Sequence, residues 1–168
     1  MKKETKIEFK KKLLTALLIS AELIIILLTT VVCIGNGYRG FKIDSALLVF
    51  LAVLSILSAI ASSLIAFFTS DRFSASFFAF IWIISGISHL VSLLTLGAES
   101  VGSFASSFIL IGSFPMYSIM PVLLKITTSA SAIYIICSLF SFAVGGFNIF
   151  SAVRKVTEKD EKKSESKQ

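Results

Sequence analysis

Residues 13–34 read LLTALLISAELIIILLTTVVCI, an apolar run in which Glu22 is the single charged side chain. A helix rises about 1.5 Å per residue, so about 20 apolar residues cross the roughly 30 Å hydrocarbon layer of a membrane. Lys10, Lys11 and Lys12 directly precede the run. Because basic residues are retained on the cytoplasmic side, we expect a membrane-spanning helix that starts in the cytoplasm.

Three further runs of similar length follow at about 46–68, 75–96 and 130–153. Residues 35–40 (GNGYRG) indicate a turn between the first two runs, and residues 70–72 (SDR) a tight polar link between the next two. With 55% hydrophobic residues and a mean hydropathy of +0.91, the chain has more apolar surface than a soluble core of 168 residues can bury. The expected fold class is all-α, an integral membrane four-helix bundle with a partly apolar outer loop between the third and fourth spans.

That loop contains an apolar string at 104–124, which can be argued to be a fifth span. Pro115 and Pro121 lie within it, and a proline in a lipid-exposed helix leaves backbone groups that lipid cannot satisfy. With four spans, thirteen of the sixteen lysines and arginines lie on the side of both termini. A fifth span would divide them about evenly. We therefore expect four spans with both termini in the cytoplasm, in the plasma membrane or in endomembrane vesicles.

Two charged segments flank the membrane domain, the basic N-terminus at 1–12 and the tail at 154–168. The tail reads RKVTEKDEKKSESKQ, which mixes both signs without apolar periodicity, so we expect it to be disordered. The net charge of +6 resides in these terminal blocks rather than along one face, which favours a membrane surface over nucleic acid. Membrane lipids are the expected partners, including anionic lipid of the inner leaflet at the basic termini.

Two ionisable residues fall well inside the spans, Glu22 in the first and His89 in the third. Burying an acidic side chain at mid-membrane costs about 2.5–3.5 kcal/mol, so such a residue is expected to face the bundle interior and find a partner. Their heights above the inner ends, about 14 and 21 Å, predict a contact between them, direct or through water. Asn148 is a third polar group, nearer the cytoplasm. The pair has two interpretations: a structural clamp, which we favour, or a proton-titrating site.

Small residues at helical spacing predict where the helices pack closely, because small side chains let backbones approach in lipid. The expected packing positions are Ser55, Ala59 and Ser63 in the second span, Gly86 in the third, and Ser141, Gly145 and Gly146 in the last. No constellation of side chains indicates catalysis, a cofactor or a metal site. We therefore expect a protein that is not an enzyme.

The layout resembles the MARVEL-type tetraspan family. The resemblance lies in four spans, cytoplasmic ends, the tight turn at 70–72 and a last helix, SASAIYIICSLFSFAVGGFNIFSAV, that runs into a charged tail. It implies a protein that organises membrane subdomains, vesicle traffic or cell junctions without catalysis, through self-association or contact with other membrane proteins.

A second resemblance concerns Ser20-Ala21-Glu22, which is similar to the first helix of the small multidrug-resistance exporters. In that family the glutamate exchanges protons for cationic drugs, and only Glu22 carries over. The basic N-terminus, the chain length and the segment 104–124 depart from that family. The alternative function is therefore a small proton-coupled transporter that uses an intramembrane glutamate.

Overall fold

The structure is a computed structural model that describes residues 2–39, 45–69, 71–98 and 102–165. These ranges contain helices and no strands, which confirms the all-α fold class. In chain order the helices are α1 (Lys2–Arg39), α2 (Ser45–Thr69), α3 (Arg72–Leu94), α4 (Ser103–Gly112), the 3-10 helix η1 (Phe114–Met116), α5 (Met120–Ile126) and α6 (Ala130–Glu165).

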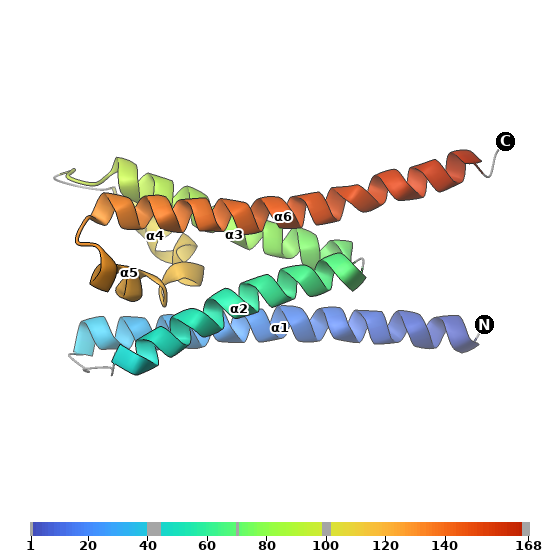
Figure 1. The fold of residues 1–168 in the computed structure, drawn as a ribbon, viewed down its shortest axis with the longest axis horizontal. Coiled ribbons are helices and arrows are strands. Elements are labelled where there is room, and N and C mark those ends of the chain that lie inside the picture. Colours follow the sequence, from blue (N-terminus) through green and yellow to red (C-terminus); the bar gives the residue numbers. More distant parts are fainter. Residues whose placement is uncertain (1, 40–44, 70, 99–101, 166–168) are drawn as a thin grey trace.

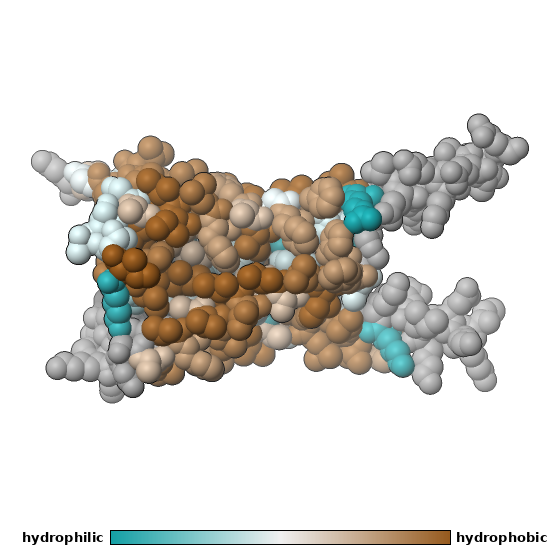
Figure 2. All heavy atoms as spheres, viewed as in Figure 1, coloured by the Kyte–Doolittle hydropathy of each residue, from teal (hydrophilic) through white to brown (hydrophobic). Residues whose placement is uncertain are grey.

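Four of these helices are long and apolar enough to cross a membrane, as the four-span prediction requires. The stretches are Leu13–Val32, Val49–Thr69, Arg72–Leu94 and Ala130–Arg154. Hydrophobic residues cover the middle of the visible face, and hydrophilic residues gather at its two ends (Figure 2). The chain is therefore a multi-pass integral membrane protein, and α4, η1 and α5 are each too short to add a fifth span.

The four long helices form two pairs, α1 with α2 and α3 with α6 (Figure 1). Both termini lie at one end of the bundle, which we call the terminal end; the opposite end is the loop end. At the loop end the short helices α4, η1 and α5 lie between the two pairs. There η1 contacts α1 and α3, and α5 contacts α2 and α6. We call this segment, residues 103–126, the wedge.

The wedge enters the bundle to a depth set by its contacts with the long helices. Ser118 is fully buried, and its Oγ donates to Ser55 Oγ of α2 at 2.8 Å. Ser55 lies six residues inside the span that begins at Val49, about 9 Å along the helix. Thr30 Oγ1 of α1 donates to the Phe114 carbonyl at 3.4 Å. These contacts shield the irregular backbone of the wedge from lipid at membrane depth, where backbone polar groups need such cover.

Gly112 makes the close approach of the wedge to α3 possible. A Cβ at this position would lie 1.7 Å from Ser88 Oγ, so no side chain fits between the two helices. Ser88 Oγ in turn donates to the Phe108 carbonyl of α4 at 3.4 Å.

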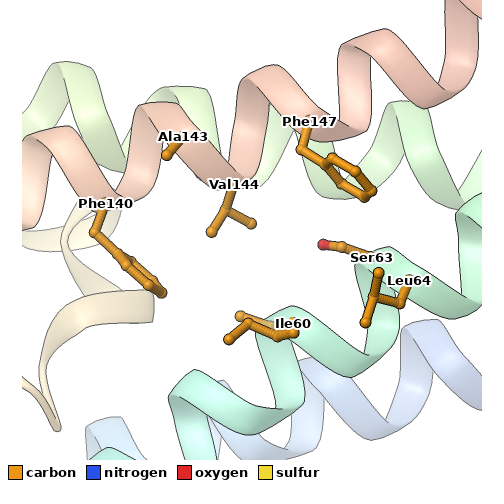
Figure 3. Close-up of a pocket in the computed structure, with 8 residues that line it drawn as sticks. Ile60, Ser63, Leu64, Phe140, Ala143, Val144 and Phe147 are labelled. Carbon is orange, nitrogen blue, oxygen red and sulfur yellow. The ribbon is translucent and has the colours of Figure 1, made fainter.

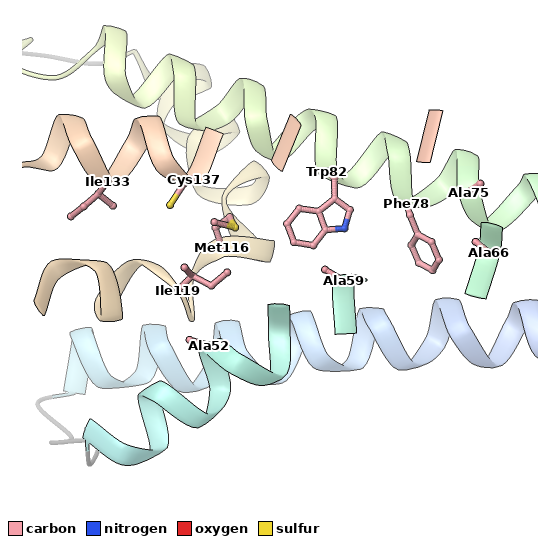
Figure 4. Close-up of a cluster of buried hydrophobic side chains, with 10 residues drawn as sticks. All are labelled: Ala52, Ala59, Ala66, Ala75, Phe78, Trp82, Met116, Ile119, Ile133 and Cys137. Carbon is pink, nitrogen blue, oxygen red and sulfur yellow. The ribbon is translucent and has the colours of Figure 1, made fainter. Parts of the chain in front are cut away.

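The core joins both pairs to the wedge (Figure 4). On α2 it is a stripe of alanines at seven-residue spacing, which returns to the same helix face every two turns. Large side chains from the other elements fill the space opposite this stripe. The fully or nearly fully buried members are Ala52, Ala59 and Ala66 of α2, Ala75, Phe78 and Trp82 of α3, Met116 and Ile119 of the wedge, and Ile133 and Cys137 of α6.

Two sequence-based expectations about segment ends are wrong. The turn expected at 35–40 does not begin there, because α1 continues as helix through Gly35 and Gly37 to Arg39; Gly40 lies outside the described residues. The tail expected to be disordered continues α6 as helix to Glu165. In both cases an existing helix is elongated, which avoids the cost of nucleation, and the tail is rich in Lys and Glu, which favour helix.

Neighbouring glycines on α6 provide a test of the α3–α6 packing. Alanine at Gly145 would place its Cβ 2.8 Å from Ile83 Cδ1 and 3.2 Å from the Ile83 backbone nitrogen. We expect Gly145→Ala to lower the free energy of unfolding by about 1–3 kcal/mol through overpacking. The measurement is detergent-induced unfolding in mixed micelles.

Gly146→Ala is the matched control, since an added Cβ there meets nothing within 4 Å. Alanine should leave the stability unchanged or raise it by up to about 1 kcal/mol, because glycine is the poorer helix former. Equal destabilisation by both variants would contradict the packing described above.

Candidate functional site

Glu22 is the most deeply buried carboxylate among the described residues, with 2% of its surface exposed. It projects from α1 toward α2, where Ser58 and Ser62 lie one turn apart on the same helix face. The Glu22 carboxylate accepts a hydrogen bond from each hydroxyl, and the Ser62 Oγ to Glu22 Oε2 distance is 3.5 Å. Two hydroxyl donors thus replace the water that the carboxylate loses inside the bundle.

His89 on α3 is fully buried in a different environment. Its Nδ1 lies 2.7 Å from the Ser85 carbonyl oxygen one turn earlier, and its ring centroid lies 6.3 Å from that of Tyr134 on α6. Because a carbonyl only accepts, Nδ1 is the donor in this bond and carries the proton. Nε2 has no hydrogen-bond partner among the described residues.

The structure does not bring Glu22 and His89 together directly, so that part of the predicted contact is wrong. Glu22 bonds to α2, whereas His89 bonds within α3 and faces α6. Height along the helix axes was the basis of the prediction, and height says nothing about which helices are neighbours. A contact through water stays a prediction.

Asn148 lies fully buried on α6 and joins this helix to α2. Its Nδ2 donates to Ser63 Oγ at 2.7 Å and to the Val144 carbonyl at 2.9 Å. Its Oδ1 has no partner among the described residues. Asn148 is therefore a third interior polar group, but it extends neither the Glu22 site nor the His89 site.

Serine hydroxyls also connect α3 to α6. Ser141 Oγ donates to Ser85 Oγ at 3.3 Å, and Ser138 Oγ donates to the Gly86 carbonyl at 3.2 Å. The expected packing positions that lie buried are Ser55, Ala59, Ser63, Gly86, Ser141 and Gly145. Gly146 is instead exposed: it lies about 100° around the helix from Gly145, and an added Cβ there would meet nothing within 4 Å.

Asp71 is a polar site that the sequence analysis treated only as part of a turn. It caps α3: its Oδ1 accepts from the backbone nitrogens of Phe73 at 3.1 Å and Ser74 at 3.4 Å. Its Oδ2 accepts from Ser74 Oγ at 2.6 Å and from Thr15 Oγ1 of α1. An aspartate directly before an apolar run is a helix-start signal, so the cap was readable from the sequence, whereas the bond to Thr15 was not.

Asp71 lies between two spans, and these hydrogen bonds favour the ionised form of its carboxyl group. Partial burial raises its pKa, but the hydrogen bonds from Ser74 and Thr15, with those from the two backbone amides, outweigh burial. The pKa of Asp71 therefore lies below its ordinary value. The carboxylate is ionised at neutral pH and holds the α1–α3 contact at the terminal end.

Grooves on the lipid-facing surface are mainly apolar. One lies between α2 and α6 with a volume of about 290 Å³ and is lined by Ile60, Leu64, Phe140 and Val144, among others (Figure 3). A second lies between α3 and α6, at about 530 Å³, and a third lies between α1 and the start of α3, at about 550 Å³. Neither Glu22 nor His89 lines any of the three.

The described residues contain no group of three or more His, Cys, Asp or Glu side chains arranged to hold a metal ion. Compared with known proteins, the chain matches no protein family, no curated protein and no solved structure.

The Asp71 cap predicts how stability depends on pH. Because its pKa is lower in the folded state, its contribution is complete above the unfolded value of about 3.9 and is lost as pH falls through the folded value. Thermal unfolding of the wild type should therefore shift to lower temperature in acid. Asp71→Asn should show a smaller acid shift, since asparagine still caps the helix but does not titrate.

Thr15→Val is a second variant for this prediction. It removes one donor to the carboxylate and leaves the helix cap, so its acid shift should lie between those of the wild type and Asp71→Asn. An identical acid shift in the wild type and Asp71→Asn would show that this carboxylate does not contribute.

Proposed function

We propose that the chain is a non-enzymatic four-span membrane protein that organises membrane subdomains, vesicle traffic or junctions by associating with itself or with other membrane proteins. The observation that carries this proposal is the distribution of interior polar groups. They form pairs across separate helix contacts: Glu22 with Ser58, Ser63 with Asn148, Ser55 with Ser118, and Ser85 with Ser141. Such pairs fix helix packing, whereas a catalytic or transport site gathers polar groups around one cavity.

The exposure of α1 supports association in the membrane. Only 17% of its span is buried inside the bundle, against 33–44% in the other three spans. Its exposed side chains include Leu17, Ile24, Leu27 and Val31, which recur at helical spacing. Membrane helices associate by close van der Waals packing, so this face is the proposed contact surface. The proposed orientation places both basic termini in the cytoplasm, next to anionic lipid.

Counting subunits in a lipid bilayer tests this proposal. We expect single complexes of the fluorophore-labelled full-length chain to photobleach in more than one step at low protein-to-lipid ratio. Leu27→Trp, at a side chain 59% exposed on α1, should reduce the oligomer fraction several-fold by steric conflict.

Leu139→Trp is the matched control, at a side chain 66% exposed on α6, and it should leave the oligomer fraction unchanged. A wild type that stays monomeric at every protein density, alone and in its native membrane, would refute the organising role.

Proton-coupled transport is the second candidate, and the Glu22 site is the observation that favours it. Within the described residues, Glu22 hydrogen-bonds to hydroxyls rather than to a lysine or arginine. A carboxylate held in this way gains or loses a proton without breaking an ion pair. Buried membrane carboxylates of proton-coupled carriers act through such exchange.

Glu22→Gln distinguishes the two candidates in one comparison. Under the organising proposal, the wild type releases no protons when cations are added, and the variant loses stability because the amide replaces an acceptor with a donor facing two serines. The measurements are pH-dye proton release and detergent-induced unfolding. Cation-dependent proton release by the wild type, lost in a fully stable variant, would instead establish transport.

A further inference from the structure

The groove between α2 and α6 has the shape and chemistry of a site for one hydrocarbon chain. Its walls are apolar apart from Ser63, whose hydroxyl is engaged by Asn148 Nδ2 at 2.7 Å (Figure 3). A volume of about 290 Å³ suits a single chain and is too small for a second helix, which is about 10 Å across with its side chains.

The groove starts near the middle of the α6 span and extends toward the terminal end. Its lining runs along α6 from Phe140 to Phe147, and the α6 span ends at Arg154. These two residues therefore lie about 21 and 10 Å along the helix from Arg154. One leaflet contributes about 15 Å of hydrocarbon, so the groove begins inside the leaflet at the terminal end and reaches about the middle of the membrane. An acyl chain rooted at the surface by its headgroup would follow the groove to about that depth.

Aromatic side chains connect the groove to a positive charge at the surface. The Phe147 ring lies 5.6 Å from the Phe67 ring of α2, centroid to centroid. The guanidinium carbon of Arg154 lies 5.3 Å from the centroid of Phe67. This cation–π contact places Arg154 on the α2 side of α6, the same side as this groove, about 10 Å along the helix from the nearest lining residue, Phe147.

We propose that this groove is a binding site for one anionic phospholipid, with an acyl chain along Phe140 to Phe147 and its phosphate beside Arg154. The guanidinium of an arginine near the membrane surface pairs with lipid phosphate. A zwitterionic headgroup would bring its own cation next to Arg154, whereas a headgroup of net negative charge does not. The site depends on α2 and α6 within one chain, so it is independent of whether copies associate.

Trp82 is a built-in reporter of occupancy, because it is the only tryptophan in the chain. It is 1% exposed, and its ring packs edge-to-face against Phe140 with a centroid distance of 5.7 Å. Phe140 also lines the groove, so a single ring separates the indole from a bound acyl chain. Bromine on that chain quenches indole fluorescence at short range.

The experiment measures Trp82 fluorescence of the full-length chain in phosphatidylcholine vesicles that contain increasing fractions of brominated phosphatidylglycerol or brominated phosphatidylcholine. We expect half-maximal quenching at an about fivefold lower mole fraction of the anionic lipid, as one basic contact provides. Arg154→Gln should abolish this preference. Lys10→Gln, the same charge loss on α1 at the same end, should retain it.

A second pair of variants tests the groove itself. Ala143→Leu fills the groove and should reduce quenching by both brominated lipids. Ala61→Leu, at an exposed position of α2 outside the groove, should leave quenching unchanged. Equal quenching of the wild type by the two lipids, in proportion to their mole fractions, would overturn the proposal. So would the absence of quenching by either lipid, because the groove would then be closed or covered by protein.

Discussion

The membrane interior supplies no hydrogen-bonding partner, and this constraint governs the architecture more than any single contact does. A polar side chain within a span must bond to its own helix or to a neighbour. Serine suits both uses, because its hydroxyl is short and can donate and accept at the same time. The result is a bundle in which Ser55, Ser63, Ser85 and Ser141 each join two elements of the fold. Individually such bonds are worth about 0.6 kcal/mol, so they specify neighbours more than they add stability.

The same constraint explains the wedge. Pro115 and Pro121 prevent residues 103–126 from forming one continuous helix, so their backbone must be shielded from lipid. Insertion between the two helix pairs provides this shield, and Thr30, Ser55 and Ser88 contribute the contacts from three different spans. Without the wedge, the α1–α2 pair and the α3–α6 pair would be separated at the loop end. A segment that interrupts the span pattern thus completes the core.

The sequence was sufficient to predict the fold class and the four spans, because a long apolar run between charges has one stable solution in a bilayer. It predicted burial of Glu22 and His89 for the same reason, and it named Asn148 as a third polar group of the last span. Their partners were not predictable, since bonds such as Glu22 to Ser58 depend on how the helices are arranged around one another. The depth of the wedge was also not predictable, because hydropathy does not show whether an apolar loop lies on the bundle or inside it. Helix ends were misjudged where glycine or charge interrupted a helix that was already formed.

The continuation of α6 beyond the bilayer has a mechanical consequence. From Arg154 to Glu165 the helix extends about 17 Å past its membrane-spanning part without a break (Figure 1). Because the helix is uninterrupted, no loop separates this arm from the membrane-spanning part of α6, and a displacement of the arm is passed along one continuous helix. Gly145 and Gly86 bring α6 into close contact with α3, so a displacement of α6 also reaches that helix. A contact made by the arm at the membrane surface is therefore linked to the bundle interior by one continuous helix.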